Sequence, residues 1–188
     1  MFTESGHNSQ EYGGGNNGVC GVGWKQFDRP SGGWCMKVIQ GQKTQLDAEA
    51  TCRSEGATLS SLQNEQEILW ITSAALNLFT ERNGTLWIGA KRTAGCMTSL
   101  LTSTCNGITS FEWTDGSATG TAGFLWNRRQ PDNDKRVQQC AALLAMDIPQ
   151  SNHPWPWIRN RLDDFGCEDI GRDLLTSRGF VCGKRSLK

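Results

Sequence analysis

Eight cysteines place the strongest constraint on how this 188-residue chain can fold. No two of them form a C-x-x-C pair, the spacing that zinc sites favour, and only two histidines are present to assist. We therefore expect four disulfides, formed in an oxidising compartment outside the cytosol. Eight cysteines allow about a hundred pairings, so spacing alone does not choose among them. They are Cys20, Cys35, Cys52, Cys96, Cys105, Cys140, Cys167 and Cys182.

Charge and hydropathy exclude several classes of protein. Nineteen basic and nineteen acidic side chains cancel, so no overall field attracts nucleic acid. The longest apolar run, residues 140–146, is too short to insert across a bilayer. No charged and apolar leader opens the chain, so no signal peptide is visible in it. The serines lack an elbow motif and no catalytic triad can be assembled, so we expect a protein that is not an enzyme.

The order of patterns along the chain indicates an α+β fold. Residues 1–19 are rich in Gly and Asn and are predicted to be a flexible tail, followed by one domain over 20–184 and a short tail over 185–188. Residues 24–27 and 34–39 flank a cluster of turn-forming residues and predict a hairpin. Two helices are expected next, and then short strands at 86–89, 111–113, 140–144 and 180–182.

The first predicted helix carries a start signal, and the second an apolar spacing. Thr44 and Asp47 form a capping-box pattern that opens a helix over 47–55, and Gly56 closes it. A second helix is predicted from Asn64 to about Leu78. One buried face of it is expected to hold Ile68, Ile71, Ala75 and Leu78.

Several of these elements, taken in order, resemble the C-type lectin-like domain over residues 20–184. They are Trp34-Cys35, the helix bearing Cys52, the 86–89 strand, Phe111 to Gly116, Trp126-Asn127, Gln130-Pro131-Asp132, Cys140, Cys167 and Phe180 to Cys182. The resemblance implies two helices packed on small antiparallel sheets with a long loop region. It also implies disulfides between Cys52 and Cys182, Cys140 and Cys167, and Cys20 and Cys35, which leaves Cys96 to pair with Cys105.

The resemblance further implies a single calcium site. In calcium-binding members, a Gln-Pro-Asp or Glu-Pro-Asn loop beside a cis proline supplies two ligands, and residues before the next two cysteines supply the rest. Calcium takes six to eight oxygen ligands, which carboxylates and amide carbonyls provide. The matching positions here are Gln130, Asp132, Gln138, Asp163 and Asp164. An amide replaces an acid at 138 and an acid replaces an amide at 163, so three carboxylates remain; the alternative is a surface loop that only keeps the turn.

The same loop implies a carbohydrate site formed by Gln130, Asp132, Gln138 and Asp163. Pairing Gln130 with Asp163, and Asp132 with Gln138, would offer each sugar hydroxyl one amide and one carboxylate. No aromatic residue follows the loop within 133–137, so we do not expect a conventional galactose site. A second calcium position would use Asn133 and Gln139, where the family often has acids, and it is expected to be empty or weak.

The remaining aromatic residues and one sequon receive simpler interpretations. Trp87, Trp113 and Trp126 match core positions of the family. Trp157 is expected in the strand before Asp163 with its ring in the core, while Trp155 is interpreted as loop packing, with ligand stacking as the alternative. Asn83-Gly84-Thr85 is a glycosylation sequon in a predicted loop.

The sequence thus favours a secreted, calcium-dependent carbohydrate-binding domain that recognises a glycan or glycoprotein. Two alternatives stay open: a calcium-independent lectin-like module that binds a protein partner, and a structural or crystal-surface binder on the same fold. No heptad or collagen-like stretch indicates an oligomeric state.

Overall fold

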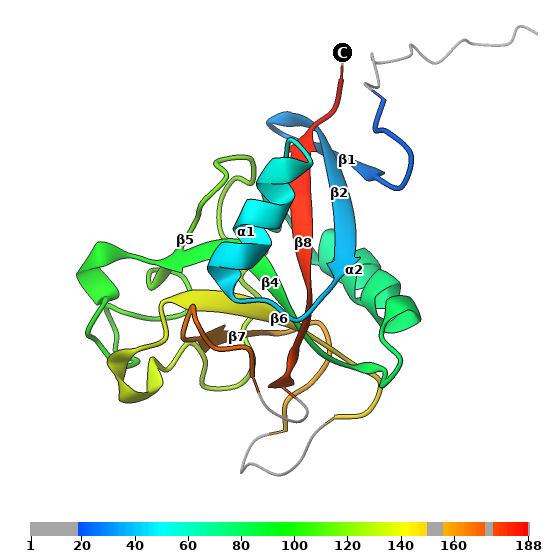
Figure 1. The fold of residues 1–188 in the computed structure, drawn as a ribbon. Helices are drawn as coiled ribbons and strands as arrows, with labels where there is room; N and C mark the ends of the chain where they lie inside the picture. Colours follow the sequence, from blue (N-terminus) through cyan, green and yellow to red (C-terminus); the bar gives the residue numbers. More distant parts are fainter. Residues whose placement is uncertain (1–18, 150–155, 172–174, 188) are drawn as a thin grey trace, which may run out of the picture.

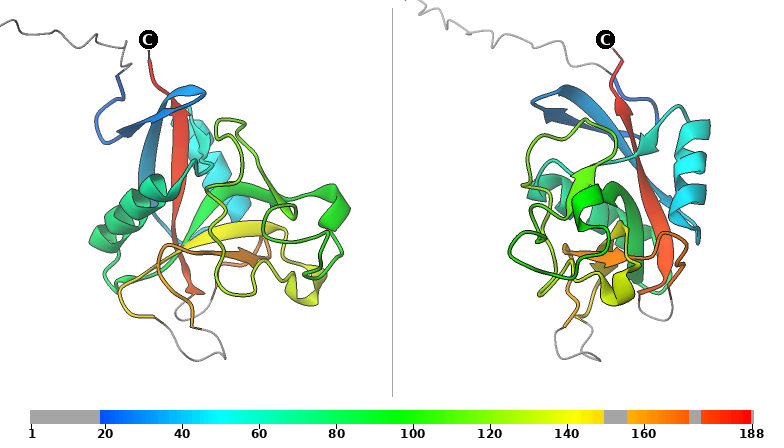
Figure 2. Two further views of the ribbon diagram at one scale, coloured as in Figure 1. Left: turned by 180° about the vertical axis from the view of Figure 1, so that it is seen from behind. Right: turned by 90° about the vertical axis from the view of Figure 1, so that its left-hand side faces the viewer.

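One mixed β-sheet with a helix on each face forms the frame of the molecule (Figures 1 and 2). The computed structural model describes residues 19–149, 156–171 and 175–187. Its strands are β1 (Lys25–Arg29), β2 (Gly32–Gln40), β3 (Thr58–Leu59), β4 (Asn83–Arg92), β5 (Phe111–Trp113), β6 (Cys140–Met146), β7 (Leu162–Phe165) and β8 (Ser177–Arg185). The helices are α1 (Gln45–Ser54) and α2 (Glu65–Leu78), with short 3-10 turns η1 (Ala94–Cys96) and η2 (Asp134–Arg136). These elements confirm the α+β class expected from the sequence.

The strand order of the sheet brings distant parts of the chain together. It runs β1-β2-β8-β4-β6-β7, with β3 paired to β8 and β5 paired to β4. The last strand, β8, is antiparallel to β2 and parallel to β4, so it lies in the middle of the order. The predicted hairpin is β1 and β2, paired from Lys25 with Met36 to Arg29 with Gly32.

Alternate residues of the central strands fill two separate cores. Leu86, Ile88 and Ala90 of β4 face α2, and pack with its buried residues. Trp87, between them in sequence, points to the other face and packs in the core that includes Ala48 and Cys52 of α1. Because side chains alternate across a strand, one strand supplies both cores and the two helices lie on opposite faces (Figure 2).

Thr44 and Asn64 are the N-caps of the two helices, although α1 begins at Gln45, two residues before the predicted Asp47. The Thr44 side chain accepts a hydrogen bond from Asp47 N at 3.2 Å, and Asn64 Oδ1 accepts one from Glu67 N at 3.2 Å. These bonds satisfy backbone N–H groups that the first turn of a helix leaves without partners. After α1 the chain turns at Gly56, whose φ of +66° favours glycine.

One residue of the predicted α2 face was wrong. Ile68, Ile71 and Ala75 are fully buried, but Leu78 is 44% exposed. The helix ends at Leu78, and the extended backbone of the next residue turns Phe79 into the core instead.

The four predicted disulfides are confirmed. They join Cys20 to Cys35, Cys52 to Cys182, Cys96 to Cys105 and Cys140 to Cys167, and no cysteine is left free. Cys52–Cys182 ties α1 to the middle strand β8, and Cys140–Cys167 ties the start of β6 to the segment after β7. Each closed loop lowers the entropy of the unfolded chain and so stabilises the folded one.

The structure differs from the expected borders at Val19, at residues 185–187 and at Asn83. Strand β8 continues to Arg185 and Leu187 bridges to Val19, so pairing extends past both predicted limits of the domain. The sequon residue Asn83 is the first residue of β4 rather than part of a loop.

In the described part of the chain, no helix has the length and apolar character needed to cross a membrane.

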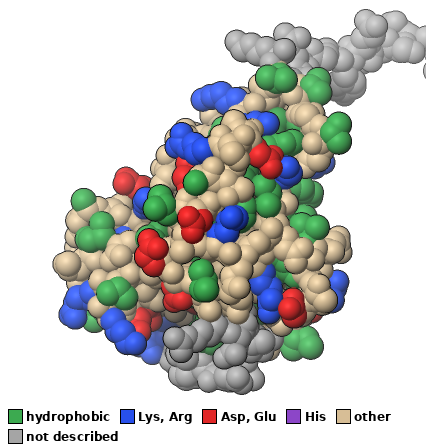
Figure 3. Space-filling view, in the orientation of Figure 1, with side chains coloured by type: hydrophobic (Ala, Val, Ile, Leu, Met, Phe, Trp, Pro, Cys, Tyr) green, Lys and Arg blue, Asp and Glu red, His purple; other side chains and the backbone are tan. Residues whose placement is uncertain are grey.

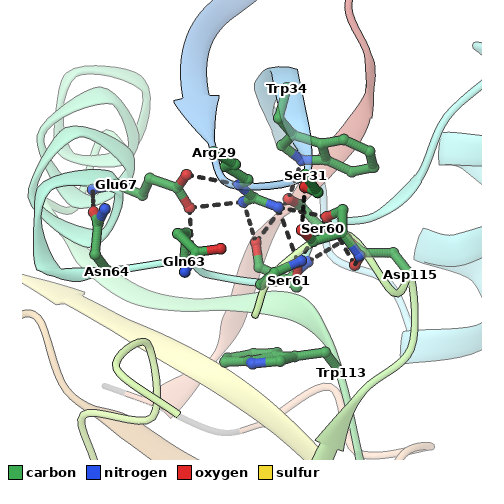
Figure 4. Close-up of polar contacts among 12 residues, drawn as sticks. Arg29, Ser31, Trp34, Ser60, Ser61, Gln63, Asn64, Glu67, Trp113 and Asp115 are labelled. Carbon is green, nitrogen blue, oxygen red and sulfur yellow. Dashed lines mark hydrogen bonds and ion pairs between the residues drawn. The ribbon is translucent and has the colours of Figure 1, made fainter. Parts of the chain in front are cut away.

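A buried arginine joins the hairpin to α2 (Figure 4). Arg29 donates from Nε and Nη2 to the two carboxylate oxygens of Glu67, at 2.8 and 2.7 Å. Its side chain is 0% exposed and that of Glu67 is 2% exposed. Arg29 also donates to Ser61 O at 2.9 Å, and Asp115 accepts from Ser61 N at 2.7 Å. The network therefore connects the hairpin, α2 and the segment after β5.

We expect Glu67→Gln to lower the free energy of unfolding by about 3–5 kcal/mol, because it leaves the Arg29 guanidinium buried without a counter-charge. Denaturant unfolding with the disulfides intact measures the loss. Glu65→Gln is the matched control on the same helix, because Glu65 is 61% exposed and its ion pair with Arg161 is long, at 4.0 Å; at most about 1 kcal/mol should be lost there. Equal losses for the two variants would contradict the structural role of Arg29.

Candidate functional site

The Gln130-Pro131-Asp132 segment forms a tight loop before β6. The Gln130–Pro131 peptide bond is cis. Pro131 is buried, whereas Gln130 and Asp132 are half-buried at the surface. Gln130 Oε1 accepts a hydrogen bond from Asp132 N at 2.9 Å, so the first side chain of the loop is held against the backbone of the last.

A buried ion pair lies directly beneath this loop. Arg92, at the end of β4, contacts Asp164 of β7 through Nη2, and the two side chains are 1% and 0% exposed. Asp164 also accepts from the loop backbone: Oδ1 from Asp132 N at 3.1 Å and Oδ2 from Asn133 N at 2.8 Å. Arg92 Nε donates to Gln138 O at 2.7 Å. One arginine and one aspartate therefore bind both ends of the segment 132–138.

Burial controls the ionisation of the acids here. It raises the pKa of Asp164 to about 6, although hydrogen bonds from the loop backbone and the charge of Arg92 act in the opposite direction. Burial and the neighbouring Asp164 charge raise the pKa of Asp163 well above its ordinary value. Burial also lowers the pKa of Arg92, against the opposing attraction of Asp164.

Asp163 points away from the loop surface. It is 3% exposed, and its Oδ2 accepts a hydrogen bond from Trp157 Nε1 at 2.7 Å. Its Oδ1 accepts from Asp164 N at 2.9 Å. Trp157 itself was wrongly predicted: it lies before β7 rather than in it, and its ring is half-buried, because the indole N–H is directed to Asp163. Trp155 lies outside the described residues.

Asp132 and Gln138 converge on one backbone group. Asp134 N donates to Gln138 Oε1 at 2.6 Å and is 3.1 Å from Asp132 Oδ1. The structure therefore brings together the two side chains that were expected to share a sugar hydroxyl. No such contact joins Gln130 to Asp163 among the described residues, because both Asp163 oxygens face inward.

Asn133 holds the neighbouring disulfide loop against this site. Its amide nitrogen donates to the carbonyls of Met97 and Ser99 at 3.1 and 2.9 Å, and its Oδ1 accepts from Gln138 N at 3.1 Å. It is fully buried and has a φ of +54°. The second calcium position considered from the sequence therefore has a structural asparagine, while Gln139 donates to Arg136 O at 3.3 Å.

Lys and Arg side chains are exposed around the 3-10 turn η2. Figure 3 shows them gathered at the lower left, where η2 lies in Figure 1. Lys135 and Arg136 are exposed there, and Arg136 Nε donates to Thr98 O at 3.0 Å. The segment 97–99 is therefore joined to the loop by both Asn133 and Arg136.

The five expected calcium ligands do not fit that ion in this arrangement. Asp164 is used by Arg92 and the loop backbone, Asp163 by Trp157 and the backbone, and both glutamine Oε1 atoms by backbone N–H groups. Calcium needs six to eight oxygens directed at one point. Across the described ranges, no three acidic, His or Cys side chains are arranged to hold a metal ion.

Arg92 is a buried residue of the candidate site that the sequence analysis did not single out. The predicted strand covered 86–89, whereas β4 continues to Arg92. Strand pairing brings Arg92 near Asp164, because Lys91 pairs with Cys140, whose neighbour Ala141 pairs with Asp164. A charged residue after a short predicted strand is ordinarily exposed, so the sequence offered no signal for this contact.

Comparisons with known proteins agree with the resemblance to C-type lectins. A family model described as C-type lectin domain-containing protein 141/158 matches residues 26–185. The chain is 30% identical over 135 residues to a galactose-binding isoform of a C-type lectin from Hoplocephalus stephensii, covering 70% of this chain and 73% of that protein. It is 27% identical over 119 residues to a mannose-binding isoform from Oxyuranus scutellatus, covering 62% and 66%.

A solved structure shares the fold at lower identity. It is a calcium-independent type II antifreeze protein, with a TM-score of 0.58, 22% sequence identity, and coverage of 92% of this chain and 98% of that one. The likeness shows that the fold also occurs in a protein described as calcium-independent.

We expect Asn133→Gly to lower the free energy of unfolding by about 1–3 kcal/mol, because it removes three buried hydrogen bonds while keeping a residue that tolerates positive φ. Denaturant unfolding measures the change. Lys135→Gly is the matched control in the same turn: its φ is +55° and its side chain is exposed, so stability should stay the same or rise slightly. A neutral Asn133→Gly would show that the contacts with segment 97–99 do not hold the loop.

Proposed function

Because the chain belongs to the C-type lectin domain family, we propose that it is a non-catalytic recognition domain that binds glycans at the cis-proline loop. The observation that carries the proposal is the meeting of Asp132 and Gln138 at the half-buried loop surface. Relatives named for galactose and mannose binding support glycans as the ligand class.

The loop side chains have hydrogen-bonding groups to offer a sugar. Within the described part of the chain, the contacts of Gln130 and Gln138 involve Oε1, and those of Asp132 involve Oδ1 and the backbone. The two amide nitrogens and the second Asp132 oxygen then supply donors and an acceptor. Sugar hydroxyls both donate and accept, so they match such a mixed set. Asp163 supports the face from below through Trp157 and Asp164.

The proposed sugars are those outside the conventional galactose type. No aromatic side chain occurs in residues 133–137, where stacking on the apolar face of galactose would require one. Asp132 and Gln138 provide a carboxylate and an amide side by side, which suits a pair of neighbouring hydroxyls.

The calcium-dependent form of the hypothesis is not the form that we propose. It requires Gln130, Asp132, Gln138, Asp163 and Asp164 to coordinate one ion, and most of their oxygens have protein partners instead. Direct hydrogen bonding to the sugar needs no such rearrangement. A chelator arm in the binding experiment distinguishes the two forms.

A protein ligand is the second candidate, and a specific surface favours it. The Cys96–Cys105 loop exposes Met97, Leu100 and Leu101 by 38%, 44% and 42%. Asn133 and Arg136 hold this loop against the candidate glycan face. Exposed apolar side chains next to polar ones are typical of protein interfaces.

We place the domain outside the cell. Four disulfides persist in oxidising compartments, and reduction would remove the closed loops that stabilise the fold. Asn83 is the proposed glycosylation site, at the start of β4 and half-buried.

We expect chelator-resistant binding on a glycan array, weakened about tenfold or more by Gln138→Ala, because the amide that faces Asp132 is lost. Titration calorimetry with the sugars that score on the array gives the affinity. Gln66→Ala, on the exposed side of α2, is the control and should bind like the unchanged protein.

Three outcomes separate the hypotheses. Binding that disappears with chelator would support the calcium-dependent form, and strong galactose selectivity would contradict the proposed sugar class. A protein that binds no glycan, but loses a protein ligand when Leu100 and Leu101 are changed to Ser, would support the second candidate.

A further inference from the structure

We propose that Arg92 is a built-in cation that holds the cis-proline loop in its ligand-presenting shape, so that this loop is ordered without calcium. The inference concerns how the loop is held and does not depend on which ligand the loop binds.

The guanidinium reaches the three segments that form the site. Nη2 contacts Asp164 on β7, and Nε donates to the carbonyl of Gln138 just before β6. Through Asp164, the same cation is linked to the N–H groups of Asp132 and Asn133. An ion at the centre of a loop performs the same task, since it gathers oxygens from separate segments around one positive charge.

Packing keeps the arginine in this position. Its side chain is 1% exposed, and its guanidinium carbon lies 4.6 Å from the centre of the Phe111 ring on β5. The planar guanidinium stacks on aromatic faces and forms directed hydrogen bonds, so its orientation is well defined. The backbone of Arg92 is also fixed, because its N–H donates to Gln139 O at 2.9 Å.

Charge explains why the arginine and calcium exclude each other. Arg92 is attracted by both Asp164 and Asp132. A calcium ion bound to Asp164 would lie next to the guanidinium, and two cations sharing one buried carboxylate repel each other strongly. Asp164 can therefore serve one of them at a time.

Removal of Arg92 alone does not open a calcium site. Asp163 keeps its hydrogen bonds with Trp157 and with the Asp164 backbone. The Oε1 atoms of Gln130 and Gln138 keep theirs with the N–H groups of Asp132 and Asp134. The loop therefore depends on the guanidinium itself, and calcium does not replace it.

Arg92→Gln is the decisive variant, and the melting temperature is measured in EDTA and in millimolar calcium chloride. The unchanged protein should melt at the same temperature in both and give no heat on calcium titration. Arg92→Gln should melt about 10 °C lower in EDTA, because Asp164 loses its buried partner. Calcium should not restore the loss, because Asp163 and the two glutamine amide oxygens keep their protein partners.

Two controls accompany it. Lys91→Gln removes the same charge from the adjacent exposed position and should behave like the unchanged protein. Arg92→Lys keeps the charge but loses the two-point contact, so it should melt lower than the unchanged protein and stay insensitive to calcium.

Every outcome decides the proposal. Calcium heat or a chelator-sensitive melting temperature in the unchanged protein would overturn it, as would a folded Arg92→Gln that melts at the temperature of the unchanged protein. If Arg92→Gln does not fold, hydrogen exchange on the unchanged protein decides: in EDTA the amides of Asp132 and Asn133 should be as protected as in calcium, and rapid exchange there would refute the role of Arg92.

Discussion

The buried contact between Arg92 and Asp164 is the interaction on which the shape of the ligand face depends. Neither charge reaches water, so each requires the other, and removal of either leaves an uncompensated ion in the interior. Because the two residues come from the central strand β4 and the edge strand β7, the pair also fixes how the sheet meets the loop. Asp164 also holds the loop backbone, because its two carboxylate oxygens accept hydrogen bonds from two loop N–H groups.

A second buried arginine, Arg29, also forms an ion pair with an acid, but it joins other segments of the chain. Arg29 holds the first hairpin to α2 through Glu67, and the serine hydroxyls around it satisfy its remaining donors. Arg29 thus holds the hairpin and the segment before α2 in place, and Arg92 holds the cis-proline loop. A hydrophobic core alone does not position these segments. Non-directional packing fills the two cores, whereas directional hydrogen bonds set the paths of the loops.

Local patterns were sufficient for much of the fold. Capping at Thr44 and Asn64 depends on neighbours three residues away, so the helix starts were readable from the chain. The disulfide pairing came from the family resemblance and not from spacing. Leu78 was misassigned because a helix period does not say where the helix stops, and Trp157 because its indole N–H found a partner six residues later.

The candidate site was harder to read for a physical reason. The letters of Gln130, Asp132, Gln138, Asp163 and Asp164 describe which oxygens are present, but not which of them are already hydrogen-bonded. That depends on Arg92, which is separated from Asp164 by 72 positions and meets it only through the strand order. Burial then decides the outcome, since the same carboxylates in water would be open to an ion.

The bridge between Val19 and Leu187 sets the direction in which the molecule can be presented. In Figure 1, β8 runs to the C-terminus at the top, and the yellow-green η2 turn lies at the lower left, at the other end of the molecule. A surface, tether or fusion partner joined at either of these points would leave the cis-proline loop facing outward. The molecule can therefore be attached at the Val19–Leu187 end while the cis-proline loop stays accessible to a ligand.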